Sequence, residues 1–220
     1  MWDHETIMMI VQGVGETLYM TVLSTVLGYL FGLPMGVLLA VSDKEGLKPN
    51  AVLYKILDAI ANIVRSIPFL ILLILLIPFT RAVVGKSYGS TATVVPLVVA
   101  AIPFIARMVE SSIKEVDAGV IEAARAMGAS NMRIIVKSAS GRSQNFTDHR
   151  SKRLRLERFL VIPQMSGAVG GGGLGDIAIR YGYYRYQSDI MIVTVILLVI
   201  LVQIFQSVGM LIANKIDRRK

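Results

Sequence analysis

The residue types that could do chemistry in this chain are histidines and glycine-rich turns, and both are few. There are no cysteines, which excludes disulfides and thiolate metal sites, and His4 and His149 are too far apart in sequence to predict a metal cluster. The spacing of Gly170, Gly172 and Gly175 matches a dinucleotide fingerprint, but no strand–turn–helix pattern surrounds it. The sequence has no Ser-His-Asp arrangement either. We therefore expect no catalytic residue and no metal, and predict a conduit or scaffold rather than an enzyme.

Long apolar runs decide the class of protein. Apolar residues are 54% of the 220 residues, and the mean hydropathy is +0.63, far above that of a soluble domain. Four runs approach or exceed the ~20 helical residues that cross a hydrocarbon core, and lie at about 17–42, 59–80, 87–106 and 190–214. Because a backbone in lipid must pair its own polar groups, these runs should be helices. The sequence predicts an all-α polytopic membrane protein with one domain, residues 1–220.

Lysines and arginines orient the predicted spans. Three lysines follow the first span and place that loop in the cytoplasm and the N-terminus outside: Lys44, Lys48 and Lys55. The basic segment 107–158 and the C-terminal tail also favour the cytoplasm. Two cytoplasmic segments require an even number of crossings between them, but only one clear apolar run, 190–214, lies there. A span is therefore missing between about residues 138 and 164.

A short motif lies in the basic loop 110–140. Its sequence is Glu122-Ala123-Ala124-Arg125-Ala126-Met127-Gly128. The motif resembles the signature loop of the membrane subunits of bacterial ABC importers, which docks into a groove on the ATPase subunit. The resemblance implies that Glu122, Ala123, Ala124 and Gly128 form the contact that couples the chain to the ATPase. In the family, an aliphatic residue, any residue, Leu and Pro follow nine residues later, whereas this chain has Ser138-Ala139-Ser140-Gly141 there.

Three further blocks narrow the resemblance to methionine-import permeases. They are Arg65-Ser66-Ile67-Pro68-Phe69, Pro103-Phe104-Ile105-Ala106-Arg107, and Met165-Ser166-Gly167-Ala168-Val169 before the glycines. The resemblance covers residues 8–137 and 165–220. It implies an ABC importer type I transmembrane domain with five spans, in which Met165, Ser166 and Gly170 line or gate the translocation path.

The same resemblance implies the partners and the location of the chain. We expect a second copy of the chain, cytoplasmic ABC ATPase subunits that bind ATP and Mg, and an external substrate-binding lipoprotein. The chain itself is expected to bind no cofactor. It is expected in the bacterial inner membrane, with its N-terminus outside and its C-terminus in the cytoplasm. A permease for another small amino acid and a non-functional remnant of such a permease are the alternative functions.

The missing span can be recovered in a neighbouring reading frame. Ser138-Ala139-Ser140 can be encoded TCT GCT TCC, followed by the G of Gly141. Read one base later, these bases are CTG CTT CCG, which encode Leu-Leu-Pro, the expected end of the signature. Similar shifts over 148–164 give an apolar helix that leads into the block at 165. We interpret 138–164 as a frameshifted fourth span, with a genuine basic insertion as the alternative. Because half of the formal charge of +8 comes from this segment, the charge does not predict a nucleic-acid partner.

Residues outside these motifs have structural interpretations. The repeat Gly28, Gly32 and Gly36 favours a close helix contact, with glycines that face lipid as the alternative. Arg65 and Arg107 lie at span ends, where arginine extends to the membrane interface, and a substrate role for either is the alternative. Five prolines are expected to interrupt apolar helices: Pro34, Pro68, Pro78, Pro96 and Pro103. A tyrosine cluster precedes the last span and suits either an interfacial aromatic belt or a docking surface for the external partner: Tyr181, Tyr183, Tyr184 and Tyr186.

Overall fold

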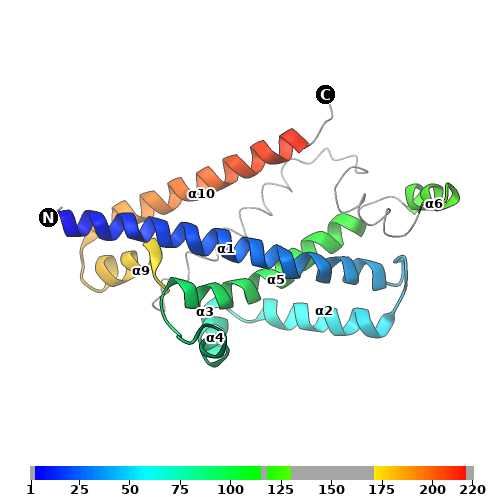
Figure 1. Cartoon of the computed structure of the whole chain (residues 1–220), viewed down its shortest axis with the longest axis horizontal. Coiled ribbons are helices and arrows are strands. Elements are labelled where there is room, and N and C mark those ends of the chain that lie inside the picture. The colour runs from blue at the N-terminus through cyan, green and yellow to red at the C-terminus, as the bar shows by residue number, and fades with distance from the viewer. Residues whose placement is uncertain (1–2, 115–117, 130–170, 217–220) are drawn as a thin grey trace. The chain divides into compact units, whose positions relative to one another are not determined.

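The computed structural model describes residues 3–114, 118–129 and 171–216, and all regular elements within these ranges are helices (Figure 1). In chain order they are α1 (His4–Ser42), α2 (Ala51–Ser66), α3 (Phe69–Leu75), α4 (Ile77–Val84), α5 (Ser90–Lys114), α6 (Ala118–Ala126), α9 (Gly173–Ile177), the π-helix η2 (Ala178–Tyr183) and α10 (Ser188–Ile216). The predicted all-α fold class is confirmed. Of the described helices, α1, α5 and α10 are each long and apolar enough to cross a membrane, and α2 with α3 forms a fourth candidate if it is one broken span.

The apolar run predicted as one span at 59–80 is not a continuous helix. The chain leaves α2 at Ser66, begins α3 at Phe69 and begins α4 at Ile77. Pro68 has no N–H to donate and restricts the residue before it, which ends α2. Pro78 lies in the first turn of α4, where the missing N–H is tolerated. The expected interruptions at Pro68 and Pro78 are therefore observed, and the bounds of the span at 59–80 stay a prediction.

The other three prolines do not end their helices. Pro34 lies inside α1, and Pro96 and Pro103 lie inside α5. Pro96 is fully buried. Membrane helices tolerate proline where neighbouring helices surround the freed backbone group, so burial explains how α5 continues through Pro96.

The described chain divides into two compact units. In the unit formed by residues 28–66 and 101–149, glycines of α1 lie directly against α5. A Cβ added at Gly32 would lie 2.8 Å from the Ile105 Cβ, and one at Gly36 would lie 2.5 Å from the Ala106 carbonyl oxygen. The predicted close contact is therefore confirmed at Gly32 and Gly36, and Gly28 is also buried.

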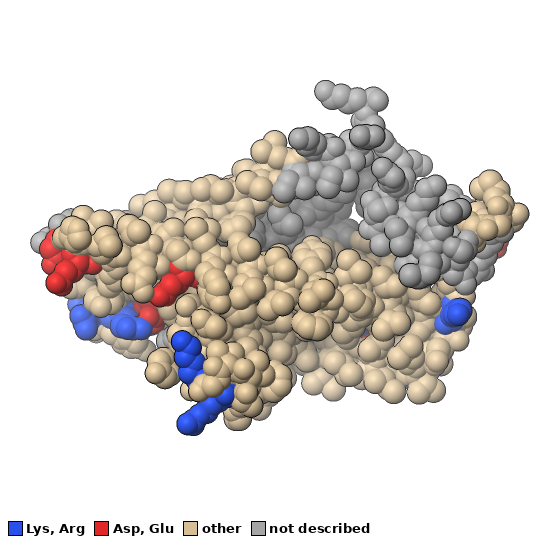
Figure 2. Space-filling view, viewed as in Figure 1, with Lys and Arg blue, Asp and Glu red and all other residues tan. Residues whose placement is uncertain are grey.

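The second unit comprises residues 1–27, 67–100 and 150–220. Its core contains Met20 of α1, Leu97 of α5, Leu174 of α9 and Thr194 of α10, all fully buried. Gly182 of η2 lies so close to α10 that an added Cβ would be 2.8 Å from the Met191 Cβ. Figure 2 shows acidic side chains near the end at which α1 begins, and the sequence of α1 has no charged residue from Thr17 to Ser42. That pattern suits a helix that enters lipid beyond its first turns.

Candidate functional site

The predicted coupling motif forms α6 and its C-terminal cap. Gly128 follows the helix with a φ of 76°, the left-handed conformation that glycine adopts most easily. The Ala129 N–H donates to the Ala124 carbonyl at 3.0 Å, and the Met127 N–H donates to the Ala123 carbonyl at 3.1 Å. The bond from Ala129 is the outer bond of a Schellman cap. The glycine of the signature thus has a conformational role at the end of α6.

The surface of α6 is open within the described chain. Glu122, Ala123 and Gly128 are exposed, Ala124 is half-buried, and the Met127 side chain is 81% exposed. A Cβ added at Gly128 would have no atom within 4 Å. No described residue of this chain therefore packs closely at this glycine.

A network of ion pairs lies at the C-terminal end of α5 and was not predicted from the sequence. Arg107 donates to Asp58 and Asn62 of α2, and its Nη1 lies 2.7 Å from the Glu110 carboxylate. We expected Arg107 to extend to the membrane interface, but here it is tied to α2. The Arg65 guanidinium lies 5.4 Å from the centre of the Phe104 ring, a cation–π geometry, so it too has a partner within the protein.

Glu110 joins this network to the loop after α1. Its side chain is only 5% exposed and accepts a hydrogen bond of 3.2 Å from the Tyr54 hydroxyl. The Lys114 Nζ lies 2.8 Å from the Glu110 carboxylate and 2.6 Å from that of Asp43. The hydrogen bond from Lys114 lowers the pKa of the Asp43 carboxyl. The spacing of Arg107, Glu110 and Lys114 places them on one helix face, and this spacing was the available signal.

At the other end of α1, polar side chains hold the start of α9. The Glu16 carboxylate accepts a hydrogen bond of 2.7 Å from the Gly173 N–H, and the Thr17 hydroxyl accepts one of 2.9 Å from the Leu174 N–H. Gly172 and Gly173 both have positive φ values, 76° and 75°. The glycines therefore form a tight turn that α1 caps through Glu16 and Thr17.

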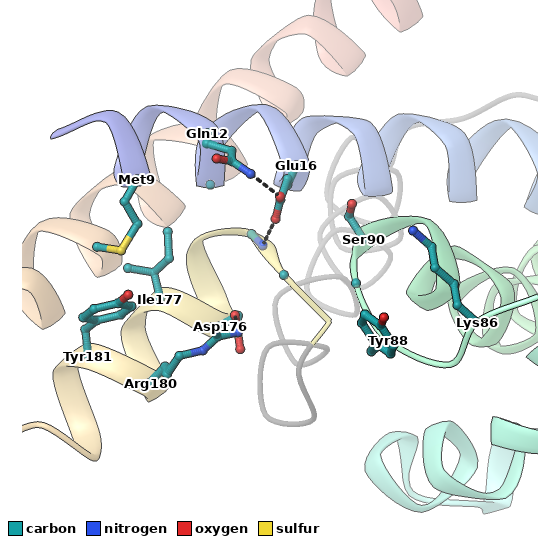
Figure 3. A pocket seen from close by; sticks show the side chains of 14 residues that line it. Met9, Gln12, Glu16, Lys86, Tyr88, Ser90, Asp176, Ile177, Arg180 and Tyr181 are labelled. Atoms are coloured by element: carbon teal, nitrogen blue, oxygen red, sulfur yellow. Dashed lines mark hydrogen bonds and ion pairs between the residues drawn. The ribbon is translucent and has the colours of Figure 1, made fainter. Parts of the chain in front are cut away.

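A cavity of about 410 Å³ lies beside this turn (Figure 3). Its charged lining residues are Glu16 of α1, Lys86 from the segment before α5, Asp176 of α9 and Arg180 of η2. Asp176 and Arg180 form an ion pair, and burial raises the pKa of the Asp176 carboxyl. Figure 3 shows Glu16 directed toward the first turn of α9, where its dashed bond ends.

Several predicted residues lie outside the described ranges. These are the proposed path or gate residues Met165, Ser166 and Gly170, and the whole segment 138–164. The tyrosine cluster is described: Tyr183, Tyr184 and Tyr186 are exposed, and Tyr186 has a positive φ of 55°.

The chain is similar to known permeases of transport systems. The family described as the binding-protein-dependent transport system inner membrane component matches residues 32–140. A probable D-methionine transport system permease protein of Vibrio cholerae is 45% identical over 204 residues, which is 93% of this chain and 90% of that protein. The D-methionine transport system permease protein of Escherichia coli K12 is 54% identical over 129 residues, which is 59% of each chain.

A solved structure gives the same answer for the fold. A chain from inward-facing conformations of the MetNI methionine ABC transporter has a TM-score of 0.88 at 44% identity, covering 99% of this chain and 100% of that one. The present chain therefore belongs to the family of binding-protein-dependent transport system inner membrane components, the permease subunits of ABC importers. The predictions of a membrane transport subunit rather than an enzyme, and of an inner-membrane component, are confirmed by this membership.

Proposed function

We propose that this chain is the membrane-spanning subunit of an ATP-driven methionine importer. The observation that supports this most strongly is the 45% identity to a D-methionine permease over 93% of the chain. The likeness to the methionine transporter structure, at 44% identity, extends over 99% of the chain and supports the same substrate. The substrate would cross along the helices of the permease, with hydrolysis of ATP in a separate subunit.

The partners follow from one chain's small number of spans. The described part of one chain has at most four candidate spans, too few to enclose a path for an amino acid, so a second copy would complete it. ATPase subunits would bind at α6, where Glu122, Ala123 and Gly128 are exposed. An external binding lipoprotein would deliver methionine on the opposite side, and the rigid-body motion of the ATPases would open and close the path.

The orientation and the gate belong to the same proposal. The N-terminus and the segment around Lys86 would lie outside, and the coupling loop and the C-terminus inside. Met165, Ser166 and Gly170 would line or gate the path, and they lie in the segment that leads to the turn at Gly172 and Gly173, where Glu16 of α1 accepts the hydrogen bond from Gly173.

The segment 138–164 is proposed to be a frameshifted fourth span. The family match ends at residue 140, close to the point where Ser138 replaces the expected continuation of the signature, which supports an interruption there. If the frameshift is present in the gene itself, the chain would be a remnant of a permease rather than a working one, and a genuine basic insertion remains the alternative. Clean resequencing in the present frame, with no apolar helix in a neighbouring frame, would remove the proposal.

Uptake of labelled methionine tests the function. The permease would be reconstituted in vesicles with its ATPase and binding protein, both with its present segment and with the frame restored. We expect ATP-dependent uptake of D- and L-methionine by the frame-restored complex, reduced by unlabelled methionine and not by other small amino acids. Uptake that another amino acid suppresses more strongly than methionine would transfer the proposal to that substrate.

A further inference from the structure

The charged face of α5 lies directly before the coupling helix. Arg107, Glu110 and Lys114 share this face, and only residues 115–117 separate Lys114 from the first residue of α6. An extended chain of that length spans at most about 14 Å from the Cα of residue 114 to that of residue 118. Any displacement of α6 is therefore delivered first to the end of α5 at which these three side chains lie.

The same face holds two other parts of the chain. Through Arg107 and Glu110 it binds α2 at Asp58 and Tyr54, and through Lys114 it binds the loop after α1 at Asp43. The Lys114 Nζ also lies 5.2 Å from the centre of the Tyr54 ring. Both partners are distant from α5 in sequence, Asp58 and Arg107 being 49 residues apart, so these contacts join α5 to a part of the chain that does not adjoin it along the backbone.

We propose that Glu110 and Lys114 are positioning residues that tie the end of α5, from which the chain continues to the coupling helix, to α2 and to the loop after α1, so that these segments and the coupling helix move as one body during transport. This inference rests on the proposed transport function. The network makes α2 follow α6, whereas without it α6 could move while α2 remained in place. Packed elements joined in this way shift between discrete arrangements rather than deform continuously.

Stability alone is a weak explanation for this network. Half-exposed ion pairs such as the one between Lys114 and Asp43 contribute little to stability, and desolvation of a buried carboxylate such as Glu110 offsets its attraction to a cation. Glu110 is almost fully buried, and the Arg107 Nε is buried without a hydrogen-bond partner among the described residues. An unsatisfied buried donor lowers the stability of the fold, so stability does not account for the network, and a fixed connection between α5 and its partners does.

Lys114 is the residue whose removal tests the connection with least damage. Glu110 keeps Arg107 and Tyr54 as partners when Lys114 is changed to methionine, and Asp43, with 24% of its side chain exposed, can be hydrated. Methionine also retains much of the apolar stem of lysine. Replacement of Arg107 would instead break its contacts to Asp58, Asn62 and Glu110 at once, so it would not isolate one connection.

The deciding measurement is a distance between α2 and α6. Because the chain has no cysteine, spin labels can be placed at exposed Lys55→Cys and Ala126→Cys without a background label. In the complex with its ATPase, we expect one narrow distance distribution that stays nearly constant when ATP binds. In the Lys114→Met variant the distribution should broaden and shift with ATP, while Lys48→Met, which removes an exposed lysine of the loop, should leave it unchanged.

Transport gives the second readout. Methionine moved per ATP hydrolysed should fall about 5-fold in Lys114→Met, a typical size for lost coupling between sites, and Lys114→Arg should restore it because the cation remains. Should Lys114→Met fail to assemble, Asp43→Asn breaks only the loop contact and is expected to broaden the same distance. Unchanged distances in both variants, or an unchanged coupling ratio with wild-type distances, would overturn the inference.

The distance readout also separates this inference from the proposed substrate. Both the present chain and its frame-restored form are labelled in complex with the ATPase, and neither distance measurement requires methionine to be transported. A complex that moves no methionine but loses its narrow distance in Lys114→Met would refute the substrate and support the network. Methionine transport with identical distances in every variant would support methionine as the substrate and refute the network.

Discussion

Replacement of Gly128 should weaken the coupling of ATP hydrolysis to uptake without removing the protein from the membrane. At a φ of 76° the left-handed conformation costs an alanine about 1–2 kcal/mol, and it costs a β-branched valine more. Nothing lies within 4 Å of the added Cβ, so this conformational term is the whole cost within the described chain. A loss of 1–2 kcal/mol reduces the ratio of capped to frayed helix ends by about 5–30-fold.

A graded series at Gly128 separates backbone conformation from space for the ATPase. Asparagine is larger than alanine but tolerates the left-handed conformation, so a conformational role predicts that Gly128→Asn retains more coupling than Gly128→Ala. A role in close packing predicts the opposite order, because the larger side chain then obstructs the partner. Uptake and stimulated ATPase activity would be measured together in frame-restored complexes. Unchanged values for both in Gly128→Val would refute the assignment of Gly128 to the coupling contact.

Two further predictions concern the described helices. Gly36→Leu should destabilise the protein by about 3 kcal/mol, because its Cβ would lie 2.5 Å from the Ala106 carbonyl oxygen. Gly15→Ala is the control: it places a Cβ in open space on the same helix, and should be neutral or stabilising. Thermal unfolding in detergent measures both variants, and equal melting temperatures would contradict the packing argument. Because Lys114 lowers the pKa of Asp43 in the folded state, the ionised carboxylate stabilises the fold above its unfolded-state pKa of about 3.9, and this contribution is lost as the pH falls through the lower folded-state pKa. Unfolding followed between neutral pH and about pH 3 should therefore show a smaller decline in Asp43→Asn, and parallel curves would contradict the pairing.

The features that the sequence predicted are those that depend on local pattern. Apolar run length predicted helices where α1, α5 and α10 lie, and a spacing of four residues predicted the contact at Gly32 and Gly36. The glycine of the coupling motif was predicted as a contact residue, and the structure adds its conformational role at the end of α6.

The features that the sequence did not predict are pairings over long separations. Arg107 and its partner Asp58 are 49 residues apart, and Glu16 and Gly173 are 157 residues apart. An arginine at a span end has several favourable partners, including lipid headgroups and water, so the sequence alone cannot select the one in the fold. A capping side chain similarly shows its partner only when another helix start is brought beside it.

The segment 138–164 leads to the prediction with the largest effect. It contains six basic residues, Arg142, Arg150, Lys152, Arg153, Arg155 and Arg158. Each arginine or lysine at the centre of a membrane helix costs about 2.5–3.5 kcal/mol on insertion scales, so several together make a crossing by this sequence unfavourable. Without a fourth crossing, the last apolar run, 190–214, would place the basic C-terminal tail on the wrong side or fail to insert.

Either outcome removes the part of the path that the family builds between its fourth and fifth spans. We therefore expect no methionine uptake by the chain with its present segment, and uptake by the frame-restored chain, when each is expressed with the same ATPase and binding protein. Membrane fractionation and accessibility of a C-terminal tag report whether each chain inserts and on which side its tail lies. Equal uptake by the two chains would show that the basic segment is a tolerated insertion, and would refute the topology argument on which the frameshift depends.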